Sequence, residues 1–164
     1  DAITRGLSSF GRDVLSHNLK SMRVFGYFFG GYYAGMDSLQ TYYRKNMELL
    51  DKDVRDALFG ARDIYTKVRD SAPSKYLDGA KVKDSLISDG CVIEGTVERC
   101  ILFRGVRVGK GTVLKNSIVM QDTVIGANAE LDCVITDKNV VIRDNMRLAG
   151  CESLPYFVMK GRML

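Results

Sequence analysis

The segment from Val82 to Leu148 repeats one short pattern four times. Aliphatic residues recur in two rows, and both rows keep the same intervals of 15, 17 and 17 residues. The first row is Val82, Val97, Leu114 and Leu131, and the second is Ile93, Val108, Ile125 and Ile142. A helix or an ordinary array of hairpins has no reason to preserve such intervals. The segment is therefore expected to form a solenoid in which each repeat stacks on the next.

The spacing within each repeat indicates the kind of solenoid. Apolar residues recur about every six positions, as in Val108, Leu114 and Met120, which is the hexapeptide pattern of a parallel β-helix. Each repeat also carries a small residue followed by two aliphatic residues. These triplets begin at Ser85, Cys100, Ser117 and Cys133. The pattern predicts three short strands per coil with tight corners, and hence a triangular prism.

The first 36 residues carry weaker signals. Asp1 to Lys20 has a weak helical periodicity, and Met22 to Met36 is rich in aromatic residues and glycine. Aromatic and β-branched residues favour strands, so one or two strands joined at Gly30 and Gly31 are expected. The glycines form neither a GxGxxG nor a GxxxxGK phosphate loop, so we expect no cofactor here.

Two helices are expected next. Asp37 can cap the first one, with Gln40 three residues later as in a capping box, and the helix should end near Asp51. Its apolar face is expected to be core. A second short helix is expected from about Val54 to Leu58, followed by an extended run from Ile64 to Val68.

The repeats are bounded by a linker and a tail. Ser71 to Ser74 is expected to be the linker, because Pro73 disfavours helix at the residue before it. Glu152 to Leu164 breaks the repeat with Pro155 and is expected to cap one end of the prism. We expect the N-terminal segment to cover the other end. The sequence begins abruptly at Asp1, so we also expect the chain to be cut from a longer protein.

Composition excludes several classes of protein. Hydrophobic residues make up 46% and charged residues 27% of the chain, which is ordinary for a globular protein. The net charge of +4 is slight, and no basic run with interleaved aromatics points to nucleic acid. No membrane span or signal peptide is visible, so we expect a cytoplasmic protein.

Cysteine and histidine are too sparse for the usual chemistry of hexapeptide proteins. The four cysteines, Cys91, Cys100, Cys133 and Cys151, form no CxxC pair and are expected to be free thiols. His17 is the only histidine. Hexapeptide-repeat acyltransferases resemble this solenoid but generally rely on a histidine base, and the γ-type carbonic anhydrases need three histidines for zinc. Neither requirement is met within the repeats.

One basic cluster stands out in the solenoid, between Phe103 and Lys110. Strand alternation should point Arg107 outward if Val106 and Val108 face inward. The cluster is either an ordinary solvated surface or a patch that contacts an anion or another subunit.

The order of these segments resembles the C-terminal portion of a bacterial ADP-glucose pyrophosphorylase, also called glucose-1-phosphate adenylyltransferase. The resemblance covers nearly all of the chain. The matching stretches are Phe10 to Leu15, Gly31 to Tyr33, Asp37 through Leu50, and Ser85 to Gly150. The resemblance implies a mainly β fold: a left-handed parallel β-helix at residues 73–164 with a C-terminal cap. Residues 1–72 would be a small α+β remnant, the end of a nucleotidyltransferase-type α/β domain plus the linker.

Departures from the family pattern narrow the resemblance. Catalytic members read roughly GYWEDVGTIDS where this chain reads GYYAGMDS from Gly31 to Ser38. The family's metal-binding aspartate has no counterpart, because Asp37 aligns with the later Asp-Ser. Catalytic members also carry an aspartate where this chain has Ser9, and its loss would remove a ligand of the metal that neutralises the phosphates. The chain thus resembles the non-catalytic GlgD-type subunit, as does its Tyr65 to Val68 stretch.

The resemblance also implies a function. The family makes ADP-glucose and pyrophosphate from ATP and glucose 1-phosphate, but these residues contain no glycine-rich nucleotide loop. We therefore expect no catalytic, cofactor-binding or metal-binding residue in this chain, with Mg²⁺ needed only by a catalytic partner. The expected role is regulation and oligomerisation in glycogen synthesis, in a hetero- or homo-oligomer with a catalytic GlgC-type subunit.

Effector binding is a further expectation from the family. Its anionic sugar-phosphate or nucleotide effectors bind between two domains through basic residues. One family arginine aligns with Gly105, which leaves Arg104, Arg107 and Lys110 as displaced candidates. Phe10, Gly11 and Tyr33 would be remnants of a sugar pocket. Two alternatives stay open: an acyltransferase-like enzyme of the hexapeptide class, and a purely structural solenoid.

Overall fold

The computed structural model describes residues 3–60, 64–66 and 69–164 of the chain. The chain divides into two compact units, Asp1–Gly31 and Tyr32–Leu164, and each is described by itself. The domain boundary expected between residues 72 and 73, which separates the end of a nucleotidyltransferase-type domain from the β-helix, stays a prediction.

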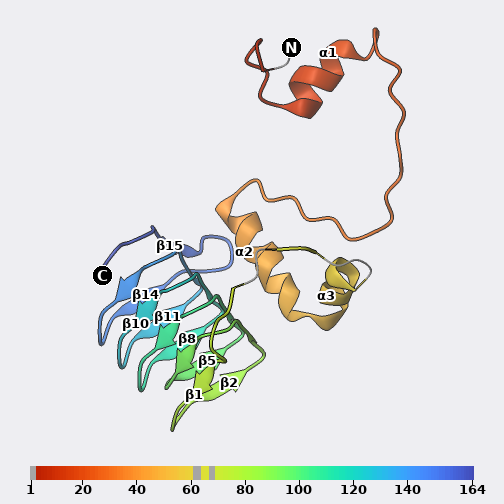
Figure 1. Ribbon diagram of the computed structural model, residues 1–164. Helices are drawn as coiled ribbons and strands as arrows, with labels where there is room; N and C mark the ends of the chain where they lie inside the picture. Colours follow the sequence, from red (N-terminus) through yellow and green to blue (C-terminus); the bar gives the residue numbers. More distant parts are fainter. Residues whose placement is uncertain (1–2, 61–63, 67–68) are drawn as a thin grey trace. The chain divides into compact units, whose positions relative to one another are not determined.

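The second unit contains a parallel β-helix with three walls (Figure 1). Each wall is a sheet of five short parallel strands, one from each successive coil. Sheet A contains β1 (Lys75–Tyr76), β4 (Val92–Ile93), β7 (Arg107–Val108), β10 (Val124–Ile125) and β13 (Val141–Ile142). Sheet B contains β2 (Lys81–Lys83), β5 (Thr96–Glu98), β8 (Val113–Lys115), β11 (Glu130–Asp132) and β14 (Arg147–Ala149). Sheet C contains β3 (Leu86–Ile87), β6 (Ile101–Leu102), β9 (Ile118–Val119), β12 (Val134–Thr136) and β15 (Tyr156–Val158). The fold class expected from the repeats is confirmed.

The two aliphatic rows of the sequence line the interior of the prism. The row through Val97, Leu114 and Leu131 lies in register along sheet B, and the row through Val108 and Ile125 lies in register along sheet A. These side chains are at most 2% exposed. Stacking therefore buries what a single coil could not bury alone.

One shortened corner explains the irregular interval. Four residues connect sheet A to sheet B after β7, β10 and β13, but only Glu94 and Gly95 connect β4 to β5. Both rows cross this corner once, so both contain one interval of 15 among intervals of 17. Gly95 is required there, because a Cβ atom on it would lie 2.5 Å from the carbonyl oxygen of Thr112.

Residues with left-handed backbone conformation form the other corners. Asp84, Arg99, Asn116 and Cys133 have φ angles between 43° and 52° and stack between sheets B and C. This register corrects the sequence analysis by one residue in its last repeat. Ile118 pairs with Ile135, so Val134, and not Cys133, continues the small-residue position of Cys100 and Ser117. The sequence does not reveal this shift, because Cys and Ser are both small, whereas the backbone register is set by the ladder of hydrogen bonds.

The C-terminal tail completes the last coil. β15 pairs with β12, and Met163 bridges to Val141 at the edge of sheet A. Val158 joins the core with 3% exposure, and Leu164 packs against it. The expected cap is thus made by further pairing along sheets A and C, while β14 ends sheet B.

Three helical segments precede the prism in the second unit: α2 (Leu39–Met47), the 3₁₀ turn η2 (Glu48–Leu50) and α3 (Lys52–Phe59). Their positions confirm the two expected helices. The predicted cap is wrong by one residue, since Ser38 accepts a hydrogen bond from the backbone N–H of Thr41 and the Thr41 hydroxyl accepts one from that of Ser38. The Asp37 carboxylate instead accepts a hydrogen bond from the hydroxyl of Thr41 at 2.8 Å.

Helix α2 packs on the outer face of sheet C. Tyr43 is 3% exposed and forms a second apolar cluster with Ile118, Cys133 and Ile135. The sequence predicts that the segment before the repeats covers an end of the prism. That expectation is wrong for α2, because sheet C presents an aliphatic row outward and the helix covers this side wall. In the first coil, Val82 stays 38% exposed, although Val97 above it is fully buried.

The first unit contains a π-helical turn, η1 (Phe10–Leu15), that continues into α1 (Ser16–Asn18). The strands predicted between Met22 and Met36 are absent; this stretch is irregular. Most of its side chains are exposed, including Tyr27 at 88% and Phe28 at 94%, so strand propensity here meets no paired neighbour. Of the extended run expected from Ile64 to Val68, residues 64–66 form no strand and residues 67 and 68 lie outside the described part.

Candidate functional site

The interior of the prism carries hydroxyl groups but no reactive constellation. Its buried hydroxyls bond to backbone groups of neighbouring coils. Thr112 donates to the carbonyl oxygen of Gly126 at 2.6 Å and accepts from the N–H of Ala129 at 3.1 Å. Ser117 accepts from the N–H of Val134 at 3.1 Å. These groups join coils to one another, which satisfies them as buried polar atoms must be satisfied.

All four cysteines lie in the described part of the chain and are free thiols. Burial raises the pKa of Cys91 and Cys133, and raises the pKa of Cys100 to about 12. Cys151 is exposed, and a hydrogen bond with the Ser153 side chain lowers its pKa. Within the described residues, no group of three or more His, Cys, Asp or Glu side chains could hold a metal ion. The three buried thiols therefore act as small core residues.

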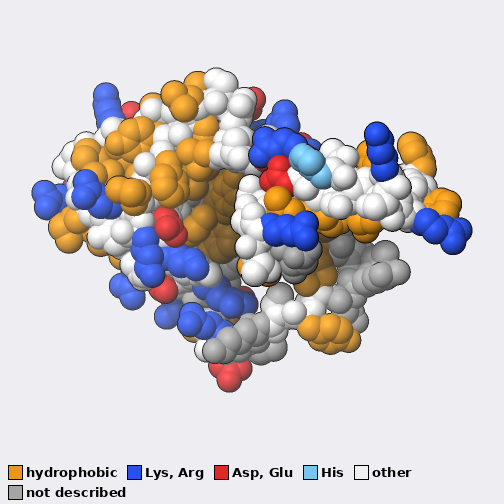
Figure 2. Space-filling view, turned by 90° about the horizontal axis from the view of Figure 1, so that it is seen from above, with side chains coloured by type: hydrophobic (Ala, Val, Ile, Leu, Met, Phe, Trp, Pro, Cys, Tyr) orange, Lys and Arg blue, Asp and Glu red, His pale blue; other side chains and the backbone are white. Residues whose placement is uncertain are grey.

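The predicted basic residues lie on one coil of the prism. Val106 and Val108 are buried and Arg107 between them is exposed, which confirms the predicted alternation. Arg104 lies in the corner before β7 and Lys110 in the corner after it. None of the three forms an ion pair with a residue of the described ranges. On the face shown in Figure 2, Lys and Arg side chains occur at several separate places among hydrophobic ones.

Aliphatic and acidic residues of the adjacent coils surround the basic residues of this coil. In sheet A, Arg107 lies between Val92 and Val124 of the adjacent coils, so its guanidinium projects from an aliphatic surface. The Asp122 carboxylate lies close to Gly105, because a Cβ atom built on that glycine would lie 2.5 Å from Asp122 Oδ1. An anion at this coil would meet Arg107 and Lys110 more favourably than Arg104, whose corner carries the opposite charge nearby.

The sugar-pocket remnants are divided between the two units. Phe10 and Gly11 begin η1, and Phe10 is 71% exposed. Tyr33 belongs to the second unit and is 80% exposed. The assignment of the three residues to a sugar pocket stays a prediction.

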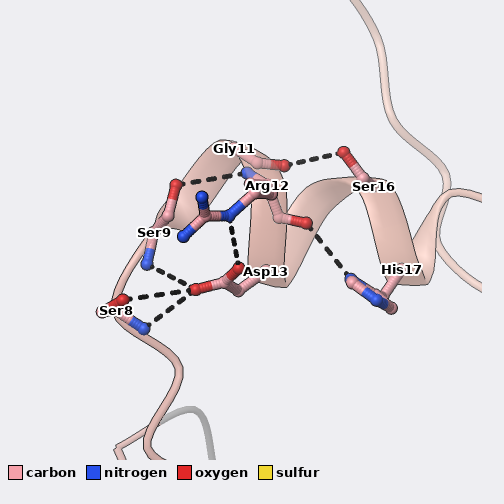
Figure 3. A network of polar contacts seen from close by, with 7 residues as sticks. All are labelled: Ser8, Ser9, Gly11, Arg12, Asp13, Ser16 and His17. Atoms are coloured by element: carbon pink, nitrogen blue, oxygen red, sulfur yellow. Dashed lines mark hydrogen bonds and ion pairs between the residues drawn. The ribbon is translucent and has the colours of Figure 1, made fainter.

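A polar network caps the helical turn of the first unit (Figure 3). The Asp13 carboxylate accepts hydrogen bonds from the backbone N–H groups of Ser8 and Ser9 at 3.2 and 2.9 Å, and from Arg12 Nε at 3.1 Å. The bond from the Ser9 backbone, followed by the one from Arg12, lowers the pKa of Asp13. The Ser9 hydroxyl accepts from the N–H of Arg12, and His17 Nδ1 lies 3.1 Å from the carbonyl oxygen of Arg12. Ser9 thus acts here as a helix cap.

A hollow that the sequence did not predict lies between α2 and a corner of the prism. Its volume is about 450 Å³, and its lining includes Tyr43, Arg44, Glu48, Arg99 and Glu152. Glu48 already accepts hydrogen bonds from Tyr32 and Lys45, and Arg99 donates to Asn116 Oδ1 at 3.2 Å. The sequence predicts that this face of α2 belongs to the core. The sequence signal for the hollow is Arg44, which directly follows the buried Tyr43.

Comparisons with known proteins agree with this geometry. The model of the family "GlmU-like, C-terminal hexapeptide" matches residues 72–152, which covers most of the prism. No helix in the described ranges is both long enough and apolar enough to cross a membrane.

Two groups of relatives are similar over most of the chain. The chain is 42% identical to "Glycogen biosynthesis protein GlgD" of Bacillus subtilis over 92% of its length, which is 44% of the relative. It is 34% identical to a glucose-1-phosphate adenylyltransferase of Acetivibrio thermocellus over 89% of its length and 35% of that relative. A glucose-1-phosphate adenylyltransferase of Geobacillus stearothermophilus is 42% identical over 65% of the chain and 28% of the relative. The chain thus spans less than half the length of these relatives. It belongs to the ADP-glucose pyrophosphorylase (glucose-1-phosphate adenylyltransferase) family, where it corresponds to the C-terminal portion, and it resembles the GlgD type.

Proposed function

We propose that this chain is the regulatory and oligomerisation portion of a GlgD-type subunit in glycogen biosynthesis. The observation that supports the proposal most is the 42% identity to a GlgD protein over 92% of the chain. The prism provides a rigid body whose interior is filled by aliphatic side chains, so its surfaces are what it can offer to other proteins. We place the protein in the cytoplasm, where its four free thiols would persist.

The chain itself is proposed to be non-catalytic. In the family, the metal-binding aspartate precedes a Gly-Thr pair that is missing between Gly31 and Ser38 of this chain, and Ser9 stands where catalytic members carry another aspartate. The role of Ser9 as a helix cap fits a segment that has kept its fold without its metal ligand. Mg²⁺ would be needed by the catalytic partner only.

The proposed partner is a catalytic GlgC-type subunit. A conformational change in one subunit would be transmitted to the other through the prism and the helices packed on it. Two sites become coupled only through structural elements that contact both of them. An anionic sugar-phosphate or nucleotide effector is proposed to bind at Arg107 and Lys110, with Arg104 as a weaker contributor beside Asp122. The exposure of Arg107 supports this assignment.

The proposal is tested by mixing this subunit with a catalytic subunit. The intact polypeptide that carries this chain is combined with a catalytic glucose-1-phosphate adenylyltransferase from the same source. ADP-glucose formation is then measured against effector concentration, together with co-elution in size-exclusion chromatography. We expect co-elution and a changed maximal rate or effector response. Unchanged kinetics without co-elution would refute the proposal.

Effector binding has a separate test on the same assembly. Calorimetric titration with fructose 1,6-bisphosphate, as a sugar-phosphate probe, is compared between the parent and an R107A/K110A variant. We expect the variant to bind at least tenfold more weakly. Equal affinity would exclude these two residues, and absence of binding with an unchanged rate would favour a purely structural solenoid.

A further inference from the structure

The outer face of sheet B carries two rows of side chains that flank the inward aliphatic row. On strands β2, β5, β8 and β11 the upstream row is Lys81, Thr96, Val113 and Glu130, and the downstream row is Lys83, Glu98, Lys115 and Asp132, before the rows end at Arg147 and Ala149 of β14. These eight residues are called the charged face below. None of them is buried, and the four strands lie side by side in one wall of the prism (Figure 1).

The downstream row alternates in sign from coil to coil. Lys83 is followed by Glu98, Lys115 and Asp132, which gives plus, minus, plus, minus. Reversing this order gives minus, plus, minus, plus. A second copy turned by 180° about an axis parallel to the strands, midway between β5 and β8, presents the reversed order. Every charge of the row then faces an opposite charge, as a two-fold symmetric contact requires.

The upstream row has the same property under the same rotation. Lys81 of one copy faces Glu130 of the other, and the uncharged Thr96 faces the uncharged Val113. Two independent rows are therefore matched by a single symmetry operation. Like charges directly opposite one another would be repelled, so the match discriminates this orientation from a shift by one strand.

Pairing within the chain leaves part of the charged face unpaired. Lys83 lies 3.4 Å from Glu98, and Arg147 of the last strand lies 3.1 Å from Glu130. Lys81 and Lys115 form no ion pair within the described ranges. These two lysines face Glu130 and Glu98 of the rotated copy. Both lysines are therefore available to a carboxylate of a second copy.

The other two walls lack this property. The outward row of sheet A contains Lys75 and Arg107 among valines, and no acidic residue. The outward row of sheet C is aliphatic and is partly covered by α2. Sheet B is the wall whose charges complement themselves.

We infer that the charged face of sheet B binds the same face of a second copy of this chain, in a two-fold contact in which the strands run parallel and the coils stack in opposite directions. The two walls pack face to face, with Lys81 against Glu130, Lys83 against Asp132 and Glu98 against Lys115, each pair occurring twice. Four strands of three residues form a contact smaller than the roughly 800 Å² per partner of a stable complex. Exposed ion pairs each contribute little to the affinity. The contact is therefore weak alone and sensitive to salt.

Sedimentation equilibrium of the 164-residue chain tests the contact, at protein concentrations up to about 1 mM, where a millimolar dissociation constant is still detected. We expect a monomer–dimer equilibrium whose dissociation constant rises tenfold or more between about 50 mM and about 500 mM NaCl, as screening shortens the reach of the charges. A chain that stays monomeric throughout, or a dimer that is indifferent to salt, would overturn the inference.

Charge reversals then locate the contact. K115E and E98K each place like charges opposite one another in the homodimer, so each variant should dissociate at least tenfold more readily. An equimolar mixture of the two variants restores opposite charges at both positions and should recover the parent affinity within about threefold. K138E, a matched reversal on an exposed corner outside sheet B, should leave the dimer unchanged, and circular dichroism verifies that all variants are folded.

The mixture decides the question, since a loss of fold cannot be repaired by a second chain carrying a different substitution. Failure of the mixture to recover, or an equal effect of K138E, would overturn the inference. So would a monomeric chain whose K115E variant loses co-elution with the catalytic relative, which would assign the charged face to that partner. Because the sedimentation measurements use this chain alone, their outcome is independent of whether the chain regulates a catalytic partner.

Discussion

The hydroxyl of Tyr43 donates a 2.6 Å hydrogen bond to the carbonyl oxygen of Asn116, joining α2 to a corner of the prism across 73 residues of sequence. Asn116 has a left-handed backbone conformation with φ of 43°. The same hydroxyl lies 3.5 Å from the sulfur of Cys133 in the next coil. One side chain thus anchors the helix to two stacked corners.

Removing this hydroxyl should weaken the attachment of α2. Tyr43→Phe keeps the ring in its apolar cluster but leaves the Asn116 carbonyl without its partner, so we expect a loss of about 1 kcal/mol in the free energy of unfolding. Tyr43→Ala also removes the ring and should cost about 3 to 5 kcal/mol. Urea titration followed by circular dichroism measures both. Tyr27→Phe, at an exposed position, is the control, and equal stability of Tyr43→Phe and the parent would contradict the role of the bond.

A charge inside the prism should abolish cooperative unfolding. Val108 is 2% exposed in the middle of an aliphatic row, and an aspartate there would be buried without a partner. We expect Val108→Asp to show no cooperative thermal transition by calorimetry. Arg107→Ala, one residue earlier on the outer face, should melt close to the parent. A normal melting curve for Val108→Asp would be incompatible with the row being interior.

The shortened corner should tolerate only glycine. A Cβ atom at Gly95 would approach two backbone carbonyl oxygens, those of Thr112 at 2.5 Å and Gly109 at 2.9 Å, and backbone cannot move aside as a side chain can. We expect Gly95→Ala to destabilise the protein by about 1 to 3 kcal/mol. Gly11→Ala, where no atom lies within 4 Å, should have little effect. Chemical denaturation of both variants makes the comparison, and equal stabilities would argue against the close packing of this corner.

Thiol labelling should separate Cys151 from the other three cysteines. Cys151 is exposed and its pKa is lowered, so its thiolate forms at a lower pH than that of an ordinary thiol. In a 5,5′-dithiobis-(2-nitrobenzoate) assay we expect one fast equivalent in the native protein and three more after denaturation. Cys151→Ser should remove the fast phase. Rapid reaction of two or more thiols in the native state would contradict the burial of the others.

Stability should fall at alkaline pH because of Cys100. Burial raises the pKa of its thiol from 9.0 to about 12, so the folded state retains a proton that the unfolded chain releases. The contribution of this thiol is complete below about pH 9 and is lost as the pH rises toward 12. Cys100→Ser should flatten part of the decline in the urea midpoint between pH 8.5 and 10.5. An identical decline in variant and parent would show that other groups cause it.

The sequence predicted the prism because the interior imposes its own period. The positions of the rows through Val97 and Val108 are apolar in successive coils, so the sequence shows which strands stack along sheets A and B, and its interval of 15 corresponds to the shortened corner. The outward direction of Arg107 followed from the same alternation. Binding of an effector by Arg107 and Lys110 stays a prediction, since a solvent-facing cation looks alike in a sequence whether or not it has a ligand.

The remaining features depend on contacts between residues far apart in sequence. Strand propensity at Tyr27 and Phe28 could not show that this stretch lacks a paired strand. The position of Cys133 depended on the ladder between Ile118 and Ile135, and the burial of Tyr43 on an aliphatic row facing outward. Local pattern by itself determined which residues face into each coil, because burial repeats with the coil. Only the tertiary structure decided which outward surface α2 covers and which charges align across sheet B, because those neighbours are chosen by stacking.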